Sequence, residues 1–318
     1  MRALVTGAAG FIGSSIVDQL LKDGHEVVGI DCFTPYYLRT IKDNNLAKAT
    51  TSSNFTFHQI NLATEPIQPQ LEGVTDIFHQ AGQPGVRASW GGDFLQYVEW
   101  NVWATQQLLE AAMKVETLKS FVAASSSSIY GAAERFPTTE RDLPQPISPY
   151  GVTKLAAEHL CSLYRTQFGV PTVSLRYFTV YGPRQRPDMA IHRIIHSALV
   201  GEEFKLNGDG QQSRDFTYID DVVNANIKIA ESFLKGFEPS PVYNVGGNAP
   251  VSICSIIEKI ESITGFKIKV KNMPNEDGDP KNTGAGIDLI RREIKWEPEV
   301  SLVDGLRQQV IAIESGIR

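Results

Sequence analysis

The sequence has few cysteines and no long apolar run, and each absence excludes a class of protein. Its three cysteines, Cys32, Cys161 and Cys254, lie far apart and form no CxxC pair. Neither a disulfide framework nor a metal site is therefore expected, and the thiols suit a reducing compartment. The residues after Met1 form no signal peptide, and no stretch reaches the roughly 18 apolar residues of a membrane span. We expect a cytoplasmic protein with no membrane partner.

The sequence also lacks an excess of positive charge. Its 30 Lys and Arg residues against 36 Asp and Glu residues give a formal net charge of −6. Such a balance provides no general attraction to nucleic acid or to an anionic membrane surface, so we expect no nucleic-acid partner. Any anionic ligand must be held by arginines placed locally.

Short β-rich runs alternate with amphipathic segments through the first half of the chain. The strand candidates are Ala3–Val5, Glu26–Ile30, Phe55–Ile60, Asp76–His79, Phe121–Ala124 and Thr172–Arg176. This alternation predicts an α/β fold, a doubly wound parallel sheet of the Rossmann type with helices on both faces. Residues 1–178, joined by a returning segment at about 214–245, should form the sheet domain. Turn-rich residues 179–213 and 246–318 should form a smaller C-terminal substrate-binding region.

A glycine-rich turn separates the first predicted strand from the first predicted helix. Gly7, Gly10 and Gly13 permit a tight turn and close backbone approach to a pyrophosphate, whose charge then meets the helix N-terminus. Asp31 ends the next strand, where a carboxylate can bind both ribose hydroxyls and would repel a 2′-phosphate. The pattern predicts a dinucleotide site that prefers NAD to NADP.

Tyr150 and Lys154 lie four residues apart after Ser148-Pro149, which is a helix-start signal. Both side chains therefore share one helical face. A nearby ammonium, a positive nicotinamide and the helix N-terminus all favour the phenolate of Tyr150, which can then accept a hydroxyl proton. The Ser126 hydroxyl, after the fifth strand candidate, can hydrogen-bond the oxygen whose charge changes. Ser126, Tyr150 and Lys154 are thus the predicted catalytic residues.

The glycine spacing, with Thr6 before it, resembles that of the extended short-chain dehydrogenase/reductases, and the resemblance covers nearly the whole chain. It implies an NAD-dependent enzyme in which Lys154 also holds the nicotinamide ribose. The residues that would contact NAD are Gly7, Gly10, Phe11, Ile12, Gly13, Asp31, Asn61, Leu62, Gln80, Ala81, Gly82, Asn101, Tyr150, Lys154 and Tyr177.

The serine run that includes Ser126 resembles the catalytic segment of nucleotide-sugar epimerases and dehydratases. Related 4,6-dehydratases carry Asp-Glu at the places of Ser127 and Ser128, and UDP-glucuronate decarboxylases carry Glu at the second place. Those carboxylates would supply acid or base chemistry beyond the redox step. Serines at both places favour oxidation and re-reduction of one carbon, which is epimerisation.

The segment from Arg176 to Ala190 closely resembles that of the UDP-glucuronate 4-epimerases, and Thr179 stands where UDP-galactose 4-epimerases usually have Asn. The resemblance implies that Arg186 and Arg214 meet the nucleotide. On chemical grounds we hypothesise that the neutral hydroxyls of Thr179, Ser127 and Ser128 hold the sugar carboxylate. The expected substrate contacts are Pro84, Arg87, Ser126, Ser127, Ser128, Tyr150, Thr179, Arg186, Arg214 and Asp279. Two places depart from the pattern, because Glu276 replaces a usual arginine and Gly286 replaces a usual aspartate.

We therefore expect an epimerase that interconverts UDP-glucuronate and UDP-galacturonate through a 4-keto intermediate. The alternatives are a UDP-glucose or UDP-N-acetylhexosamine 4-epimerase, a UDP-glucuronate decarboxylase, and an NAD-binding sensor without activity. Helices around Asp93–Lys114 and Pro149–Phe168 also resemble the pair through which the family forms a four-helix interface. The resemblance implies a homodimer.

Overall fold

The computed structural model describes residues 1–133, 135–247, 249–274 and 280–317. Its largest element is a seven-stranded parallel sheet in the order β10-β6-β5-β4-β1-β2-β3. The strands are β1 (Arg2–Thr6), β2 (Glu26–Asp31), β3 (Phe55–Gln59), β4 (Asp76–His79), β5 (Ser120–Ser126), β6 (Thr172–Tyr177) and β10 (Val242–Val245). The predicted doubly wound Rossmann-type fold is confirmed. The strand order reverses between β1 and β4, which opens a crevice at the carboxyl ends of the strands.

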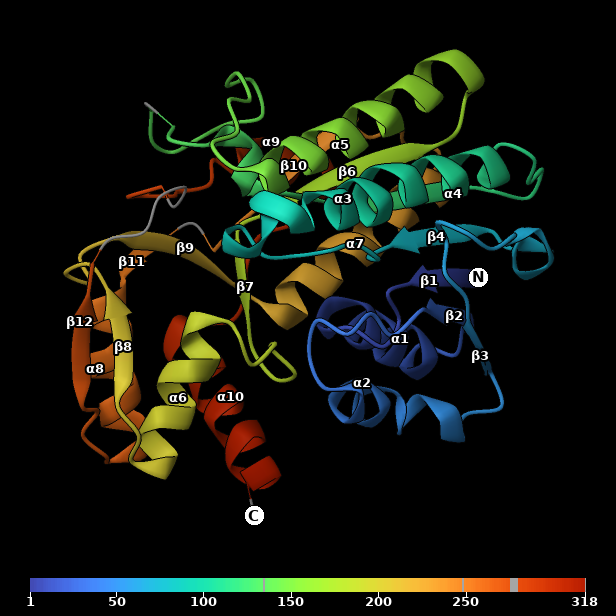
Figure 1. Ribbon diagram of the computed structural model, residues 1–318. Coiled ribbons are helices and arrows are strands. Elements are labelled where there is room, and N and C mark those ends of the chain that lie inside the picture. The colour runs from blue at the N-terminus through green and yellow to red at the C-terminus, as the bar shows by residue number, and fades with distance from the viewer. Residues whose placement is uncertain (134, 248, 275–279, 318) are drawn as a thin grey trace.

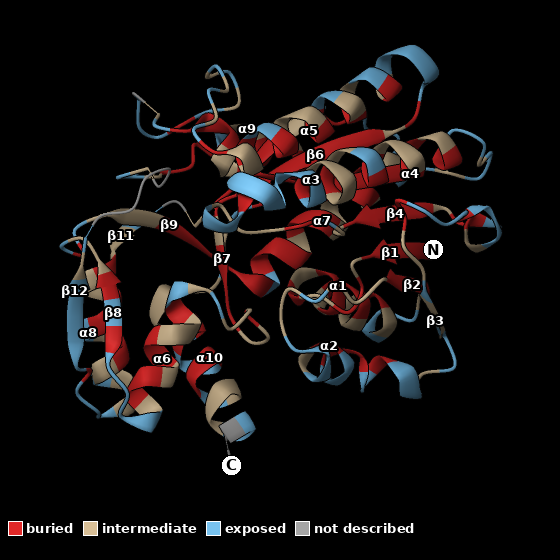
Figure 2. Ribbon diagram, viewed as in Figure 1, coloured by how far each residue is buried: buried red, intermediate tan, exposed pale blue. Residues whose placement is uncertain are grey.

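Helices cover both faces of this sheet (Figure 1). One face carries α1 (Phe11–Lys22), α2 (Arg39–Leu46) and α7 (Ile219–Leu234), and the other carries α3 (Phe94–Tyr97), α4 (Ala104–Ala112) and α5 (Pro149–Phe168). The strands other than β3 are buried on both sides (Figure 2), as their runs of valine, isoleucine and leucine require, whereas the edge strand β3 is only partly buried. Two separate hydrophobic cores result, with Ile16 and Leu20 in one and Leu108 and Leu109 in the other.

The helix α5 shows how local sequence signals place a functional segment. The Ser148 hydroxyl accepts a hydrogen bond of 3.1 Å from Gly151 N–H, and Pro149 occupies the first turn. Gly169 ends the helix in the left-handed conformation at φ 71°. These caps fix Tyr150 in the first turn of α5, at the edge of the sheet where the strands end.

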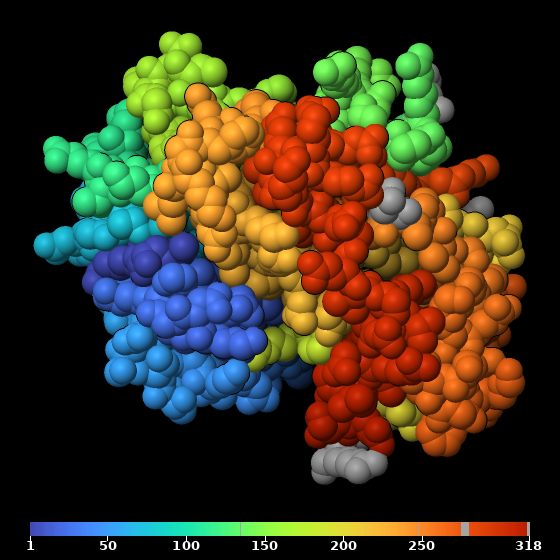
Figure 3. Space-filling model, turned by 180° about the vertical axis from the view of Figure 1, so that it is seen from behind, coloured from blue at the N-terminus to red at the C-terminus, as the bar shows by residue number. Residues whose placement is uncertain are grey.

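The other helices and strands, apart from α9, form a second, smaller lobe. They are β7 (Thr179–Tyr181), α6 (Ala190–Val200), β8 (Phe204–Asn207), β9 (Ser213–Tyr218), β11 (Pro250–Ser252), α8 (Ile253–Thr264), β12 (Val270–Met273) and α10 (Leu302–Ile317). Helix α9 (Asp288–Ile294) packs instead against β10 and α7 of the large sheet. Strands β11, β9 and β7 make a three-stranded sheet, and β12 pairs with β8. Seen from behind, the red C-terminal segment runs between the blue helices of the sheet and the orange elements of the lobe (Figure 3). No described helix is both long and apolar enough for a membrane span.

Candidate active site

A cavity opens where the strands of the large sheet end. Its wall takes residues from the β1–α1 turn, from the ends of β2 to β6 and from the start of α5. The predicted residues in this wall are Gly7, Gly10, Phe11, Ile12, Gly13, Asp31, Asn61, Leu62, Gln80, Ala81, Gly82, Pro84, Tyr150, Lys154, Tyr177 and Arg186. Folding thus gathers into one cavity residues that the sequence spreads over seven separate segments.

The glycine turn has the backbone that its spacing predicts. Gly7 lies in the left-handed region at φ 67°, and Gly10 N–H donates a 2.9 Å hydrogen bond to Gly7 O. A side chain at Gly13 would clash with the Gly7 carbonyl oxygen, so only glycine allows α1 to start this close to the turn. Because no side chain caps α1, the first N–H groups of the helix are left for an anion in the cavity.

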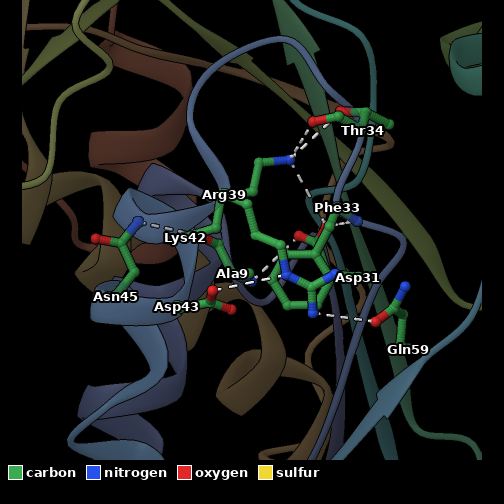
Figure 4. Close-up of polar contacts among 9 residues, drawn as sticks. All are labelled: Ala9, Asp31, Phe33, Thr34, Arg39, Lys42, Asp43, Asn45 and Gln59. Carbon is green, nitrogen blue, oxygen red and sulfur yellow. Dashed lines mark hydrogen bonds and ion pairs between the residues drawn. The ribbon is translucent and has the colours of Figure 1, made fainter.

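Asp31 is buried and already held in place (Figure 4). Its carboxylate accepts hydrogen bonds from Ala9 N–H at 3.2 Å and from Phe33 N–H at 2.7 Å. From α2, the buried Lys42 ammonium lies 3.9 Å from the carboxylate and donates to Thr34 O at 3.1 Å. The helix also supplies Asn45, whose side chain donates to Ala9 O at 3.0 Å.

The cavity fits a dinucleotide on the chemistry of its wall. An uncapped helix N-terminus suits a pyrophosphate, and Asp31 has acceptor capacity left for ribose hydroxyls. Two buried polar atoms in the wall, Trp100 Nε1 and Gln83 Oε1, have no hydrogen-bond partner among the described residues. Unsatisfied buried groups of this kind indicate a polar ligand.

Tyr150 lies in the cavity wall and is hydrogen-bonded to the side chain of Ser126, which is not itself part of the wall. Burial raises the Tyr150 pKa above its ordinary value, whereas a hydrogen bond with the Ser126 side chain and the Arg186 charge lower it. Ser126 is buried, and its hydroxyl also accepts from Ser128 N–H at 3.1 Å. The pair can exchange a proton with a substrate hydroxyl placed between them.

Lys154 shares the face of α5 with Tyr150, as its spacing predicts. Its ammonium donates a 2.6 Å hydrogen bond to Ala124 O at the end of β5. Burial lowers its pKa to about 8, and the negative charge of Glu158 acts in the opposite direction. The Arg186 charge lowers the Tyr150 pKa in this structure, and an effect of the Lys154 charge on the Tyr150 phenolate stays a prediction.

Asn101 lies behind the cavity wall, in a π-helical turn over Val98–Trp103. Its side-chain oxygen accepts from Gln83 N–H at 2.7 Å, and its amide donates to Gln83 O and to Thr153 Oγ1, each at 3.0 Å. It therefore joins the loop after β4 to the start of α5. A cofactor contact by Asn101 stays a prediction.

Several predicted substrate residues lie outside this wall and stay predictions. Ser127 and Ser128 begin a 3₁₀ turn after β5, Thr179 begins β7, and Arg87 is exposed on a short 3₁₀ turn. Half-buried Arg214, on β9, donates to Ser213 O at 2.9 Å. Asp279 and Glu276 lie outside the described residues, whereas Gly286 N–H donates to Thr138 O at 2.7 Å.

Sequence reasoning missed several residues of the site. The cavity-wall residues that the sequence did not predict include Cys32, Tyr36, Tyr37, Lys42, Gln83 and Trp100. Behind the wall, Asn226 of α7 donates to the Tyr177 hydroxyl at 2.8 Å, and that hydroxyl donates to Gln80 Oε1 at 3.1 Å. The spacing of Lys42 and Asn45 on one face of α2 is the only local pattern that could have drawn attention to any of them. Within the described ranges, no cluster of His, Cys, Asp and Glu has the grouping of a metal site.

Comparison with known proteins agrees with this geometry. Residues 3–246 match the family model for the NAD dependent epimerase/dehydratase family. The chain is 44% identical to an uncharacterized UDP-glucose epimerase, YtcB, of Bacillus subtilis, covering 99% of this chain and 98% of the relative. It is 39% identical to a UDP-glucuronate 4-epimerase of Thermodesulfobacterium geofontis, over 96% and 94% of the two chains. A crystal structure of UDP-glucuronic acid 4-epimerase from Bacillus cereus with UDP-glucuronic acid and NAD superposes with a TM-score of 0.95, at 43% identity over 99% of both chains. The chain belongs to the NAD dependent epimerase/dehydratase family.

Proposed function

We propose that this enzyme interconverts UDP-glucuronate and UDP-galacturonate by inverting C4 of the sugar with NAD as cofactor. The observation that carries the proposal is the place of Tyr150. It lies beside Ser126 in the same cavity as the glycine turn and Asp31. A relative and a solved structure that are both UDP-glucuronate 4-epimerases, at 39% and 43% identity, support the choice of sugar.

The chain has residues to hold NAD along the whole cavity. The turn from Gly7 to Gly13 would hold the pyrophosphate, Asp31 the adenosine ribose, and Lys154 the ribose nearest Tyr150. Bound NAD would take the C4 hydrogen with its electron pair and later return it, so that no external reductant is consumed.

The proton steps fall to Tyr150 and Ser126. Tyr150 as phenolate takes the proton of the C4 hydroxyl while the C4–O bond becomes a carbonyl, and Ser126 donates a hydrogen bond to that oxygen. After the 4-keto sugar turns over in the site, Tyr150 returns the proton to the oxygen of the inverted centre. Arg186, in the cavity wall, is placed to hold an anionic part of the substrate.

The two nearest alternatives differ at particular residues. Loss of CO₂ from the 4-keto uronate would recruit a carboxylate after Ser126, and this chain has Ser127 and Ser128 there. A UDP-glucose epimerase is the second candidate, because the relative at 44% identity is described as one. Thr179, in place of the asparagine usual in UDP-galactose 4-epimerases, favours the uronate.

Incubation of the purified enzyme with UDP-glucuronate or UDP-glucose, followed by NMR of the products, decides among these reactions. We expect UDP-galacturonate from the first sugar, at a higher kcat/KM than any conversion of the second. Release of UDP-xylose and CO₂ would identify a decarboxylase, and faster conversion of UDP-glucose would identify a neutral-sugar epimerase. No turnover of either sugar by protein that retains NAD would instead favour a sensor.

Tyr150→Phe tests the proton transfer. The variant should keep NAD bound but lose turnover by about 10² to 10⁴-fold, the range for loss of a general acid and base. Tyr164→Phe is the matched control, because Tyr164 lies on the same helix and its hydroxyl bonds Gln106 and Glu110 away from the cavity. Unchanged turnover in Tyr150→Phe would exclude the proton-transfer role.

The organisation of the protein forms a second part of the proposal. We assign NAD binding to residues 1–178 with about 214–245, and substrate binding to 179–213 with 246–318. A homodimer would bury the apolar side chains that α3 to α5 expose, including Leu95 at 73%, Trp103 at 49% and Leu163 at 49% exposure. Light scattering should give twice the monomer mass. The thiols, none of them in a disulfide, are compatible with the cytoplasm.

A further inference from the structure

A buried ion pair lies next to the catalytic segment without taking part in the proposed chemistry. Glu158 of α5 and Arg176 of β6 are joined by two hydrogen bonds, of 2.5 Å and 3.0 Å, and their side chains are only 4% and 6% exposed. Neither side chain is part of the cavity wall. A buried pair of this kind contributes little net stability, because the loss of water around both charges offsets their attraction.

The ion pair holds both ends of the segment that carries Ser126. The Ser125 hydroxyl donates to Glu158 Oε2 at 2.7 Å, and Ser125 lies opposite Arg176 in the parallel pairing of β5 with β6. At the far end of the segment, Arg176 Nη1 donates to the Tyr130 hydroxyl at 2.6 Å. Ser126, Ser127 and Ser128 lie between these two attachment points, so the turn they form cannot shift without breaking one of them.

The same pair also engages the helix that carries Tyr150. Glu158 comes four residues after Lys154 and eight after Tyr150, and these spacings place all three on one side of α5. Glu158 is therefore fixed to the helix with the proton-transferring residue, while its hydrogen-bond partners lie on the two strands beside it. Its negative charge also acts to raise the pKa of Lys154, against the lowering by burial.

We propose that Glu158 and Arg176 are positioning residues, which fix the Ser126 hydroxyl relative to the Tyr150 hydroxyl by joining α5, β5 and β6. The inference rests on the proposed function, because it concerns the geometry of that proton transfer. Displacements of about 1 Å at a reacting group lower turnover far more than they lower binding. Loosening this connection should therefore reduce kcat and leave KM nearly unchanged.

Tyr130→Phe loosens one attachment point without touching the cavity wall. It removes the hydroxyl that accepts from Arg176 and donates to Asn244 at 2.7 Å. Tyr243→Phe is the matched control, because Tyr243 is another buried tyrosine whose hydroxyl bridges Ser240 and Glu293 away from the cavity. We expect Tyr130→Phe to lower kcat by about tenfold with KM within about twofold of wild type, and Tyr243→Phe to leave both unchanged.

A double variant separates positioning from stability. Replacing both Glu158 and Arg176 by methionine removes the two charges together, which often preserves stability. We expect its urea-unfolding midpoint to stay near that of the wild type while its kcat falls as in Tyr130→Phe. Full kcat in a folded double variant, or equal kcat in Tyr130→Phe and Tyr243→Phe, would overturn the positioning role.

The wild-type enzyme, assayed in parallel on UDP-glucuronate and UDP-glucose, keeps the two proposals apart. Activity on UDP-glucose alone would contradict the proposed sugar. The kcat values of the variants on UDP-glucose would then test the positioning role, because both sugars react at C4. Inactivity on both sugars would overturn the proposed function and the positioning role together. Activity on UDP-glucuronate with unimpaired variants would overturn the positioning role only.

Discussion

Replacing Asn101 by aspartate tests whether the loop after β4 and the start of α5 depend on one side chain. In the wild-type structure, Gln83 N–H donates to Asn101 Oδ1 at 2.7 Å, and aspartate would keep this acceptor. Aspartate would lose the side-chain amide that donates to Gln83 O and to Thr153 Oγ1. Thr153 keeps one hydrogen bond, since its hydroxyl donates to Tyr150 O at 2.9 Å. The main loss is therefore at the Gln83 carbonyl, which would face a second acceptor.

The size of the effect follows from these contacts. A buried acceptor left without its donor costs about 1–3 kcal/mol, and the facing carboxylate oxygen adds to this, so we expect the free energy of unfolding to fall by about 2–4 kcal/mol. Protonated aspartate could donate one of the lost hydrogen bonds, so its pKa in the folded variant should be raised. A raised carboxyl pKa stabilises the folded state at low pH and loses that contribution as pH rises. The deficit of Asn101→Asp should accordingly be larger at pH 8 than at pH 5.

Urea unfolding followed by circular dichroism at both pH values measures this deficit, and calorimetric titration with NAD measures the effect on the cavity. Binding should weaken, because Gly82 and Gln83 belong to the wall that Asn101 supports. Gln96→Glu is the control, an amide-to-carboxylate change at an exposed position of α3 with an expected effect within about 0.5 kcal/mol. If Asn101→Asp matched Gln96→Glu in stability and NAD affinity, the loop would not depend on Asn101.

Two further predictions concern single groups of the nucleotide half. Asp31→Ala should weaken NAD binding by at least about tenfold and raise the affinity for NADP relative to NAD, because the ribose acceptor and its repulsion of a 2′-phosphate are lost together. Titration with both cofactors measures the ratio, which should stay constant if Asp31 has no part in the choice. Burial lowers the His79 pKa to about 3, so the folded state stays uncharged there while the unfolded chain takes up a proton below about pH 6.5. The free energy of unfolding should therefore fall by up to about 1.4 kcal/mol per pH unit as the pH is lowered from 6 to 5. In His79→Gln, the change in the free energy of unfolding with pH, measured by urea unfolding, should be smaller by that amount. An equal pH dependence in both proteins would count against a neutral buried His79.

The parts of the site that sequence predicted are those whose chemistry is local. The turn from Gly7 to Gly13 and the pair Tyr150 and Lys154 each depend on spacing within one strand–turn–helix or one helix, and both lie in the cavity wall. Lys42 has only its spacing to Asn45 on α2, which identifies no chemistry, and Asn226 has no such spacing. They reach the site because α2 and α7 pack beside the β1–α1 turn and the sheet, which is a tertiary relation that no local pattern encodes.

The strands, too, include some that the local sequence predicts and others that only their pairing in the sheet defines. The predicted run Asp76–His79 coincides with β4, because its central Ile77 and Phe78 are fully buried between the two helical layers, as in a parallel strand covered on both faces. The strand β10, Val242–Val245, was not among the candidates. It is four residues long and includes Asn244, a buried polar side chain satisfied by Thr138 O at 2.9 Å and by Tyr130. Only its pairing with β6 makes it a strand of the central sheet.

The charges around Tyr150 show where spacing stops being sufficient. A separation of four residues places Lys154 on the same face as Tyr150, but it does not set the distance or the partner of its ammonium, which bonds Ala124 O. Arg186, from the segment between β7 and α6, supplies the cation that lowers the Tyr150 pKa, and Asp188 holds that guanidinium through two hydrogen bonds of 3.0 Å. The proton affinity of Tyr150 thus depends on a residue that follows the sheet domain in the chain. The way the second lobe packs against the sheet therefore helps to set the acid–base chemistry of a residue on α5.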